Sequence, residues 1–515
     1  MFYKLFQLIR SLEKRELMVL WISAAVLVVT GTLFVVFTMT ERTEDVPVTG
    51  GTWREGSIGQ PVFINPVISG NDADQDISRL VFASLADMSD DIRSDETGRE
   101  WTVRLKEGIR WHDGEKITSD DVIFTFDTIV NPESRSPIAG NFDGASVSRV
   151  SELEFKFSLP SSYVFFGNTL RNMRIIPKHI FGNIPPANFS LSSFIREPIG
   201  SGPYKFASYE KEKNGFVSEY RLTVNKDYFG DKPFIKEIIF KYYSDKNSLA
   251  EAYMNGEIDG FLASDPGLVS GITIRREIKT LHATRYYAAF LNPSIVSAFK
   301  DASVRRSLSN DVSRDRIVNE VFGGFAVPLL GPVSGSGVSG PSARLDGLSF
   351  TITVPDLEPL VKTADILKSD WESQGAMITV KALRPADIQQ VIKDRSYEVL
   401  IFGNILNEPQ DLYSFWHSSK RFYPGLNLSM WNDRTGDSLM EEIRTEVYPA
   451  VRAELASKLT SLIADSTSAV FLASPDYIYI VSPRLKGFET TEVITPVDRL
   501  ADISKWYLVT ERKVK

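Results

Sequence analysis

Four histidines are the first residues of this chain whose chemistry could serve catalysis or metal binding: His112, His179, His282 and His417. They are scattered, and none stands in the H-E-x-x-H spacing that puts two imidazoles and a carboxylate on one helical face. The chain contains no cysteine, which excludes disulfides, iron–sulfur clusters, thiolate zinc sites and cysteine nucleophiles. The absence of cysteine fits either side of a membrane. We therefore expect neither a metal site nor a cofactor.

Neighbouring carboxylates at Asp120 and Asp121 are the next candidates, because paired carboxylates can hydrolyse a glycosidic bond. Adjacent residues of a helix point in different directions, so Asp120 and Asp121 do not face a common substrate. Carboxylates in a first helical turn are explained instead by their favourable interaction with the helix dipole. A glycosidase pair assembled from distant residues stays an open alternative. The sequence has no G-x-S-x-G and no Walker A motif, so we expect a protein that is not an enzyme.

The stretch from Trp101 to Ile129, WTVRLKEGIRWHDGEKITSDDVIFTFDTI, shows which elements position such groups. Its first residues alternate between apolar and polar, which predicts a half-buried strand. Asp113-Gly114 predicts a turn, and Thr118 followed by Asp121 predicts a capped helix start. We expect Trp111-His112-Asp113 to fix a hairpin rather than to contact a ligand.

This stretch resembles the signature of the extracellular solute-binding proteins of the oligopeptide/dipeptide ABC-transporter class, family 5. That signature combines a W-x-x-x-L strand, W-H-D-G and a T-x-D-D-V helix start. REPIGSGPYKF at 196–206 resembles the family's G-T-G-P-Y element, and the resemblance extends from about Ile58 to Trp506. It implies an α/β, two-lobed fold of the type II periplasmic-binding-protein kind, with a ligand cleft between the lobes. It also implies a monomeric domain that delivers oligopeptides or another small solute to an ABC permease.

A polar loop is the first stretch that the resemblance places at the ligand. It follows a predicted short strand from Val62 to Ile64 and precedes a predicted amphipathic helix. In the family this loop meets the peptide backbone. The corresponding residues here are Gly70, Asn71 and Asp72. A solvated loop without a ligand is the alternative.

The second ligand-facing stretch follows an apolar strand from Val399 to Phe402, and comprises Phe402, Gly403, Asn404 and Ile405. In the family, backbone groups here bind an extended peptide as an added strand. The family's acidic partner of a peptide's α-amino group falls at Ile405, which has no charge. Glu408 or Asp411 could substitute for it. Because Ile405 departs from the family's acidic residue, the ligand could also be a non-peptide solute, or the protein could be a sensor. A cell-surface enzyme on the same scaffold is a further alternative.

An uncharged segment from Leu17 to Thr40 precedes the globular part. It exceeds the about 20 apolar residues that span a bilayer. Basic residues gather before it, whereas only Arg42 follows closely, which places the N-terminus in the cytoplasm. We expect an uncleaved single-pass anchor in the cell membrane with the bulk of the chain outside, and a long signal peptide is the alternative. Glu41 to Trp53 is expected to be a linker.

Composition and motif order set the expected domains. The 515 residues are 43% apolar and 24% charged, as in globular proteins, and the net charge of -8 argues against a nucleic-acid partner. We expect a cytoplasmic stub, anchor and linker start at 1–45, and lobe I at 54–270 with an inserted subdomain at about 86–195. Lobe II is expected at 271–479, and 480–515 returns to lobe I.

Overall fold

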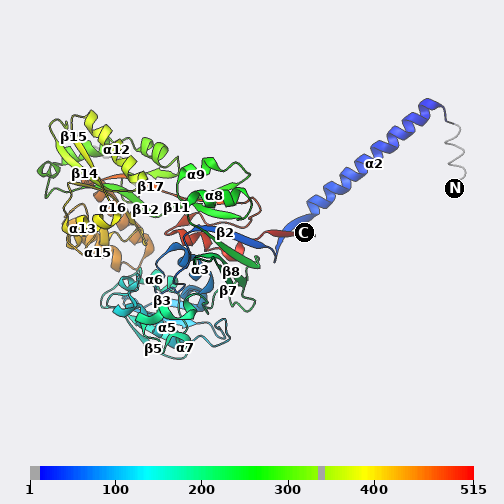
Figure 1. Ribbon diagram of the computed structural model, residues 1–515, viewed down its shortest axis with the longest axis horizontal. Coiled ribbons are helices and arrows are strands. Elements are labelled where there is room, and N and C mark those ends of the chain that lie inside the picture. Colours follow the sequence, from blue (N-terminus) through cyan, green and yellow to red (C-terminus); the bar gives the residue numbers. More distant parts are fainter. Residues whose placement is uncertain (1–11, 334–342, 515) are drawn as a thin grey trace.

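The structure, a computed structural model, describes residues 12–333 and 343–514. Helix α2 (Lys14–Arg42) projects from an elongated two-lobed body, and the subdomain containing α5 and α7 lies at the lower edge of Figure 1. The segment of α2 from Lys14 to Phe34 is long and apolar enough to cross a membrane, and none of it is buried.

Lobe I is built on an eight-stranded sheet with the order β19-β11-β18-β10-β2-β9-β8-β7. Its strands are β2 (Thr52–Ile58), β7 (Tyr204–Lys211), β8 (Val217–Val224), β9 (Glu237–Tyr243), β10 (Gly260–Ala263), β11 (Glu277–Ala283), β18 (Tyr477–Val481) and β19 (Glu492–Val493). Helices α3 (Asp72–Val81), α8 (Lys246–Met254) and α9 (Pro266–Gly271) pack on this lobe. Because β18 and β19 come from the end of the chain, the C-terminal segment completes lobe I.

The inserted subdomain holds the sheet β3-β4-β6-β5, made of β3 (Ser89–Ser94), β4 (Glu100–Leu105), β5 (Ser146–Arg149) and β6 (Glu154–Ser158). Its helices are α4 (Leu85–Met88), α5 (Ser119–Val130), α6 (Phe166–Asn172) and α7 (Lys178–Phe181). The strand predicted from Trp101 is confirmed as β4. The capped helix is confirmed as α5, whose Thr118 and Asp121 form a capping box. The buried hydrophobic residues of the inserted subdomain belong to the same core as those of lobe I.

Lobe II is built on a six-stranded sheet with the order β13-β17-β12-β16-β14-β15. The strands are β12 (Arg285–Leu291), β13 (Ala326–Pro328), β14 (Ser349–Pro355), β15 (Met377–Leu383), β16 (Val399–Ile405) and β17 (Ala469–Pro475). One face packs on α10 (Ala302–Asn310) and α12 (Glu358–Ser373), and the other on α13 (Pro385–Asp394), α14 (Tyr413–Trp416), α15 (Arg434–Thr445) and α16 (Pro449–Ser466). Strands β14 and β15 pair in parallel, and α12 connects them to form a β-α-β unit.

The chain crosses between the lobes at two adjacent places, after β11 and after β17. The Ser474 hydroxyl donates to the Ala283 carbonyl at 2.9 Å, and His282 Nδ1 lies 3.0 Å from Asp476 Oδ1. These contacts tie the crossovers together. The expected division at 270 and 479 stays a prediction, and sheet membership favours crossovers near 284 and 476.

Two expectations near the start of lobe I are wrong. The segment expected to be a linker holds β1 (Thr43–Val48) and the start of β2, where Trp53 is only 1% exposed. No strand forms at Val62–Ile64. The N–H groups of Val62 and Phe63 donate to the Asp74 carboxylate at 2.6 and 2.8 Å. A buried side chain therefore satisfies the backbone that a strand partner would have satisfied.

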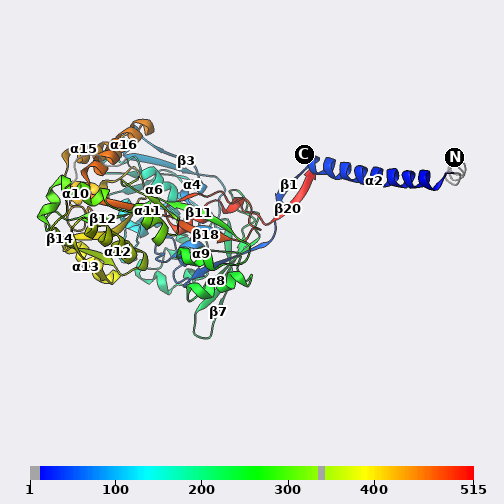
Figure 2. The same cartoon turned by 90° about the horizontal axis from the view of Figure 1, so that it is seen from above.

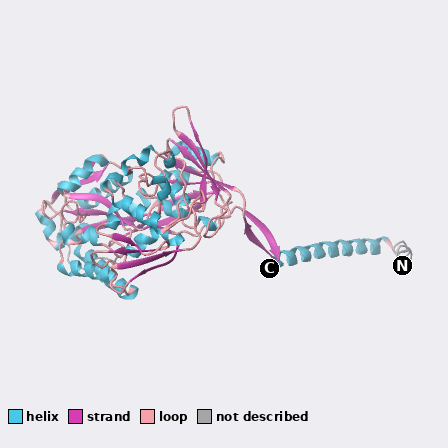
Figure 3. Cartoon of the chain, turned by 90° about the horizontal axis from the view of Figure 1, so that it is seen from below, coloured by secondary structure: helices cyan, strands magenta, loops and turns pink. Residues whose placement is uncertain are grey.

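A two-stranded ribbon joins the two ends of the globular part. β1 pairs antiparallel with β20 (Val509–Val514), directly after α2. Figures 2 and 3 show this ribbon between the body and α2, with the C-terminus at the base of the helix. The body therefore meets α2 through paired strands rather than through a free linker.

Candidate functional site

The end of β16 presents a strand edge without a strand partner. β16 pairs with β12 along its whole length, but with β14 only at Val399 and Leu400. The Leu406 N–H donates to Thr284 O at 2.7 Å. Because bonding directions alternate in an antiparallel ladder, the N–H and C=O groups of Gly403 and Ile405 point away from β12. Within 12–333 and 343–514, no strand pairs with that edge.

The two faces of this strand end have different surroundings. Asn404 is 6% exposed and donates to the Tyr286 hydroxyl at 2.7 Å, and the half-buried Phe402 packs on the same core. Gly403 lies under the Tyr287 ring, whose Cε1 is 2.5 Å from the position that a Cβ would occupy. Asn404 and Phe402 therefore support the site, whereas Gly403 and Ile405 form its open part.

The expected loop of lobe I begins helix α3. Gly70 and Asp72 are exposed, and the Asn71 carboxamide caps the helix by accepting from the Asp74 N–H at 2.8 Å. Asn71 also donates to Asp74 Oδ2 at 2.8 Å. Asn71 thus has a structural role, which leaves the backbone of Gly70 and the carboxylate of Asp72 to meet a ligand.

A buried ion-pair cluster fixes the helix that carries this loop. Arg499 is 2% exposed and bonds Glu55 of β2 and Asp76 of α3 at 2.5 to 3.0 Å. Tyr479 and Trp53 donate to the second oxygen of Glu55. Charges this deeply buried are tolerated only when every partner is in place. The returning C-terminal segment therefore positions α3.

Tyr477 connects the two expected stretches. Burial raises the pKa of its hydroxyl, Arg285 lowers it, and Asp72 and Tyr287 raise it further. The Arg285 guanidinium lies 4.2 Å from the centre of the Tyr477 ring. Arg285 is also the cross-strand neighbour of Ile405. Asp72 and Arg285 are therefore both close enough to Tyr477 for their charges to act on its hydroxyl.

Glu408 and Asp411 face the inserted subdomain instead of the open edge. Asn168 donates to Glu408 at 2.9 Å. Burial raises the pKa of Glu408, the Asn168 bond lowers it, and the nearby Asp411 raises it. Arg444 donates to both oxygens of Asp411 at 3.0 Å, and the Tyr163 hydroxyl adds a third partner at 3.1 Å. Both carboxylates therefore already have partners, and they connect lobe II to the subdomain.

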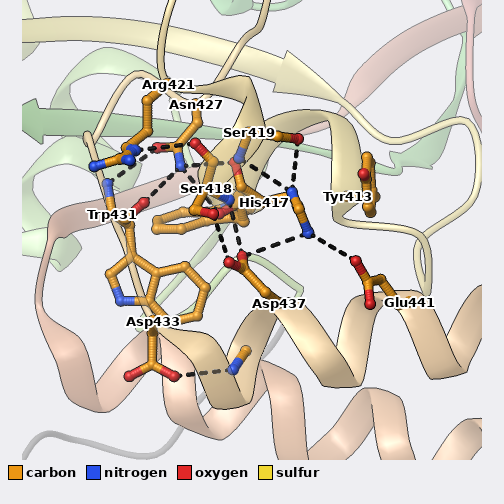
Figure 4. Close-up of polar contacts among 12 residues, drawn as sticks. Tyr413, His417, Ser418, Ser419, Arg421, Asn427, Trp431, Asp433, Asp437 and Glu441 are labelled. Atoms are coloured by element: carbon orange, nitrogen blue, oxygen red, sulfur yellow. Dashed lines mark hydrogen bonds and ion pairs between the residues drawn. The ribbon is translucent and has the colours of Figure 1, made fainter.

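A polar cluster behind α14 supports that connection (Figure 4). The His417 ring stacks on Tyr413 at 4.1 Å, and the Arg444 guanidinium also lies 4.1 Å from the Tyr413 ring. His417 Nδ1 accepts from the Ser419 N–H at 3.1 Å. In the part of the chain that the structure describes, no group of three or more acidic or histidine side chains could hold a metal ion.

The W-H-D-G and G-S-G-P-Y motifs are bonded to each other. The His112 ring accepts from the Gly200 N–H at 3.3 Å and contacts the Gly202 carbonyl at 3.1 Å through Nε2, which then carries the proton. A Cβ on Gly202 would lie 2.4 Å from the Leu80 carbonyl oxygen. These motifs therefore fix a junction between lobe I and the subdomain, which the hairpin interpretation of His112 did not include.

Arg285, Tyr287 and Tyr477 were not anticipated as site residues. Each lies in a stretch whose apolar pattern predicts a strand, and that pattern does not tell which strand pairs with which. The pairing of Arg285 with Ile405 follows from sheet order alone. Tyr163 was missed for the same reason, because its partner is 248 residues away.

Comparisons with known proteins agree with this geometry. The family model described as bacterial extracellular solute-binding proteins, family 5 Middle, matches residues 85–347. The oligopeptide-binding protein AppA of Bacillus subtilis is 24% identical, over 90% of this chain and 92% of its own length. The ABC transporter substrate-binding protein CtaP of Listeria monocytogenes superposes with a TM-score of 0.77 at 26% identity, over 89% of this chain and 99% of CtaP. The structure of AppA with a nonapeptide gives a TM-score of 0.68 at 23% identity, over 90% of this chain and all of that chain.

Two sheets joined by adjacent crossovers, with an open strand edge beside them, define a two-lobed α/β binding protein of type II. The family model covers just over half of the sequence. The chain belongs to the bacterial extracellular solute-binding proteins, family 5. Both the family and the fold class expected from the sequence are thereby confirmed. This is a family of solute-binding proteins, not of enzymes.

Proposed function

We propose that this chain is the extracytoplasmic solute-binding component of an ABC importer, and that an oligopeptide or related small solute binds between residues 70–72 and the end of β16. The open edge at Gly403 and Ile405 carries this proposal. An extended peptide can add to such an edge through main-chain hydrogen bonds, which require no particular side chains. The nonapeptide in the similar AppA structure supports a ligand of this kind.

The proposal includes the way the protein is held at the membrane. The apolar part of α2 is about 30 Å long at 1.5 Å per residue, which matches the hydrocarbon thickness. We propose that α2 remains uncleaved with its N-terminus in the cytoplasm, and that the domain works as a monomer beside an ABC permease. Protease added to intact cells then removes the large domain, whereas release of a form beginning after Thr40 contradicts the anchor.

The solute assignment is tested on the full-length chain purified in detergent. Mass spectrometry after denaturation is expected to find peptides or small solutes in near-stoichiometric amounts. Random peptide pools added to solute-free protein should be retained unchanged. Conversion of the pools into fragments would instead support the surface-enzyme alternative. If no solute is recovered and no pool is retained, the peptide assignment fails.

A non-peptide solute is the second candidate, and Ile405 is the observation that favours it. A buried ammonium group needs a carboxylate partner. Ile405 supplies none, and Glu408 and Asp411 are bonded elsewhere. A ligand without an ammonium group, taken up or sensed, meets no such requirement. Recovery of non-peptide solutes alone in the denaturation experiment would support this candidate.

A further inference from the structure

The Asp72 carboxylate and the Tyr477 hydroxyl lie near each other where lobe I meets the crossovers. The buried Arg499 cluster ties their elements together, because it includes Tyr479 of β18 and Asp76 of α3. Side chains of a strand alternate, so Tyr477 projects from the same face as Tyr479. Asp72 lies one turn before Asp76 on the same face of its helix. One step of about 6 Å along the helix and one of about 6.8 Å along the strand therefore lead from the first pair to the second. The charge of Asp72 accordingly acts on the Tyr477 hydroxyl.

Neither group has a protein partner. Among the described residues, the Asp72 carboxylate forms no ion pair, and neither it nor the Tyr477 hydroxyl forms a hydrogen bond. Although Asp72 is exposed, burial of part of its surroundings raises the pKa of its carboxyl group. The Arg285 guanidinium packs on the Tyr477 ring and donates to the Pro475 carbonyl, which holds it on the β17 side of β12. The charge of Asp72 is therefore free to pair with a cation from outside the protein.

Tyr287 connects these two groups to the open edge of β16. It is the cross-strand neighbour of Gly403, and its ring covers that residue, with Cε1 2.5 Å from the position of a Cβ. The ring stacks on Phe322 with centroids 6.3 Å apart, which fixes its orientation. Its hydroxyl has no hydrogen-bond partner in the described part of the chain, and it is close enough to Tyr477 to act on the hydroxyl there. Asp72 and two phenol oxygens, contributed by both lobes, therefore gather beside Gly403.

This set of groups suits an ammonium group. An ammonium group has three donors and no acceptor, and carboxylate and phenol oxygens accept hydrogen bonds. The hydrogen bond from an ammonium group to a carboxylate is of the strong, charge-assisted kind. Ile405, in lobe II, offers no such charge, whereas Asp72 offers one from lobe I.

We propose that Asp72, together with the hydroxyls of Tyr477 and Tyr287, binds an ammonium group of the ligand beside Gly403, so that the site takes peptides or other solutes with a free amine. The inference rests on the proposed function. Because Asp72 belongs to lobe I and Gly403 to lobe II, a ligand held in this way contacts both lobes at once.

End-blocked peptides test the role of Asp72. Solute-free full-length protein in detergent is given equimolar random pentapeptide pools without lysine, arginine or histidine, with either a free or an acetylated amino terminus. Mass spectrometry then counts what remains bound after gel filtration. Wild type should retain the free-amine pool about tenfold better, as expected of one hydrogen bond between charged groups. Asp72→Asn should abolish most of this preference.

A third pool, acetylated but containing one lysine, distinguishes the two sources of an ammonium group. Retention equal to that of the free-amine pool assigns the site to any primary amine. Retention equal to that of the acetylated pool assigns it to the amino terminus of a peptide.

Matched variants separate this role from folding. Asp387→Asn removes an exposed carboxylate that pairs with Arg384, and should keep the wild-type preference. Tyr477→Phe keeps the ring on which Arg285 packs and should reduce the preference about threefold. That variant carries the test if Asp72→Asn fails to fold. Equal retention of both pools by wild type, or a preference unchanged in Asp72→Asn, overturns the inference and leaves the peptide assignment standing. Retention of neither pool overturns the peptide assignment together with it.

Discussion

Ile405 is 45% exposed and ends the strand whose free edge we assign to the ligand. Its side chain has no charge to offer, so its main-chain N–H group is what can bind an extended peptide. One neutral hydrogen bond contributes about 1 kcal/mol net. Affinity at this residue should therefore depend on the backbone rather than on the side chain.

Replacing Ile405 with proline tests the role of that N–H group. Ile405→Pro removes the donor on the unpaired side of β16, where proline is tolerated. We expect the dissociation constant of a retained peptide to rise about fivefold. Ile405→Val keeps the N–H group and should bind as wild type does. Equal affinity for both variants, measured by calorimetry, would show that the ligand does not use this edge.

His112 shows a residue-scale effect of the motif junction on stability. Burial lowers the pKa of His112 to about 4, although the Gly202 carbonyl raises it in part. The unfolded chain has a histidine pKa of about 6.5 and binds a proton first on acidification. The contribution of His112 is therefore complete above about pH 6.5 and is lost as the pH falls toward 4, up to about 3 kcal/mol.

The pH effect is measured as a difference between wild type and His112→Gln. Burial also raises the pKa of Asp74 to about 6, against the Val62 and Phe63 N–H groups that lower it. Asp74 alone makes the fold less stable as the pH rises from about 4 to about 6, opposite to His112. From pH 7.5 to 4.5, wild type should lose about 2 kcal/mol more unfolding free energy than the variant. Parallel curves in urea titrations would rule out a buried neutral histidine.

At the scale of elements, α15 and the segment before α6 connect lobe II to the subdomain. The Val164 N–H donates to the Arg444 carbonyl at 2.9 Å, and Phe165 packs in the core of lobe II at 5% exposure. Arg444 of α15 also pairs with Asp411, and the Tyr163 hydroxyl donates a hydrogen bond to the same carboxylate. These contacts join bodies that a binding protein moves apart when it opens.

Asp411→Asn should loosen this connection. The change leaves Arg444 half-buried without its bidentate partner, which should lower the unfolding free energy by about 2 kcal/mol. Solute-free protein should then show a larger radius of gyration by small-angle scattering. Asp387→Asn removes an exposed partner of Arg384 and serves as the control. An unchanged radius of gyration in Asp411→Asn would mean that the pair does not hold the lobes together.

Local chemistry made several elements predictable from the sequence. Alternation of apolar and polar residues predicted β4, and a capping box predicted the start of α5. Turn and cap signals act within a few residues, so one segment contains all of the information. The strand expected at Val62–Ile64 failed because Asp74, twelve residues on, binds its backbone.

The candidate site was predictable only in part. Family motifs indicated Gly70–Asp72 and Phe402–Ile405, and the structure gives Asn71 and Asn404 structural partners of their own. Glu408 and Asp411 were expected as substitutes for the missing acid, but their partners come from the subdomain. Strand pairing at long sequence separation decides which side chains meet at a site. A single sequence does not contain that pairing, so Arg285 and Tyr477 became visible only in the fold.

At the scale of the whole molecule, the β1–β20 ribbon brings both ends of the globular part to the base of α2 (Figures 1 and 2). If α2 spans the membrane, the six opposed residue pairs of this ribbon set the distance between the bilayer and lobe I. A paired ribbon is stiffer than a free chain. Lobe I would then stay near the membrane while lobe II moves.

Amide hydrogen exchange tests the central claim, that a solute binds between the lobes against the free edge of β16. Full-length protein carrying its co-purified solute is compared with the same protein after removal of the solute. We predict slower exchange with solute at Gly403 and Ile405 and, at the same time, in the loop at 70–72. The outer strand β15 should exchange equally in both samples. A solute that binds without protecting either stretch would contradict the account.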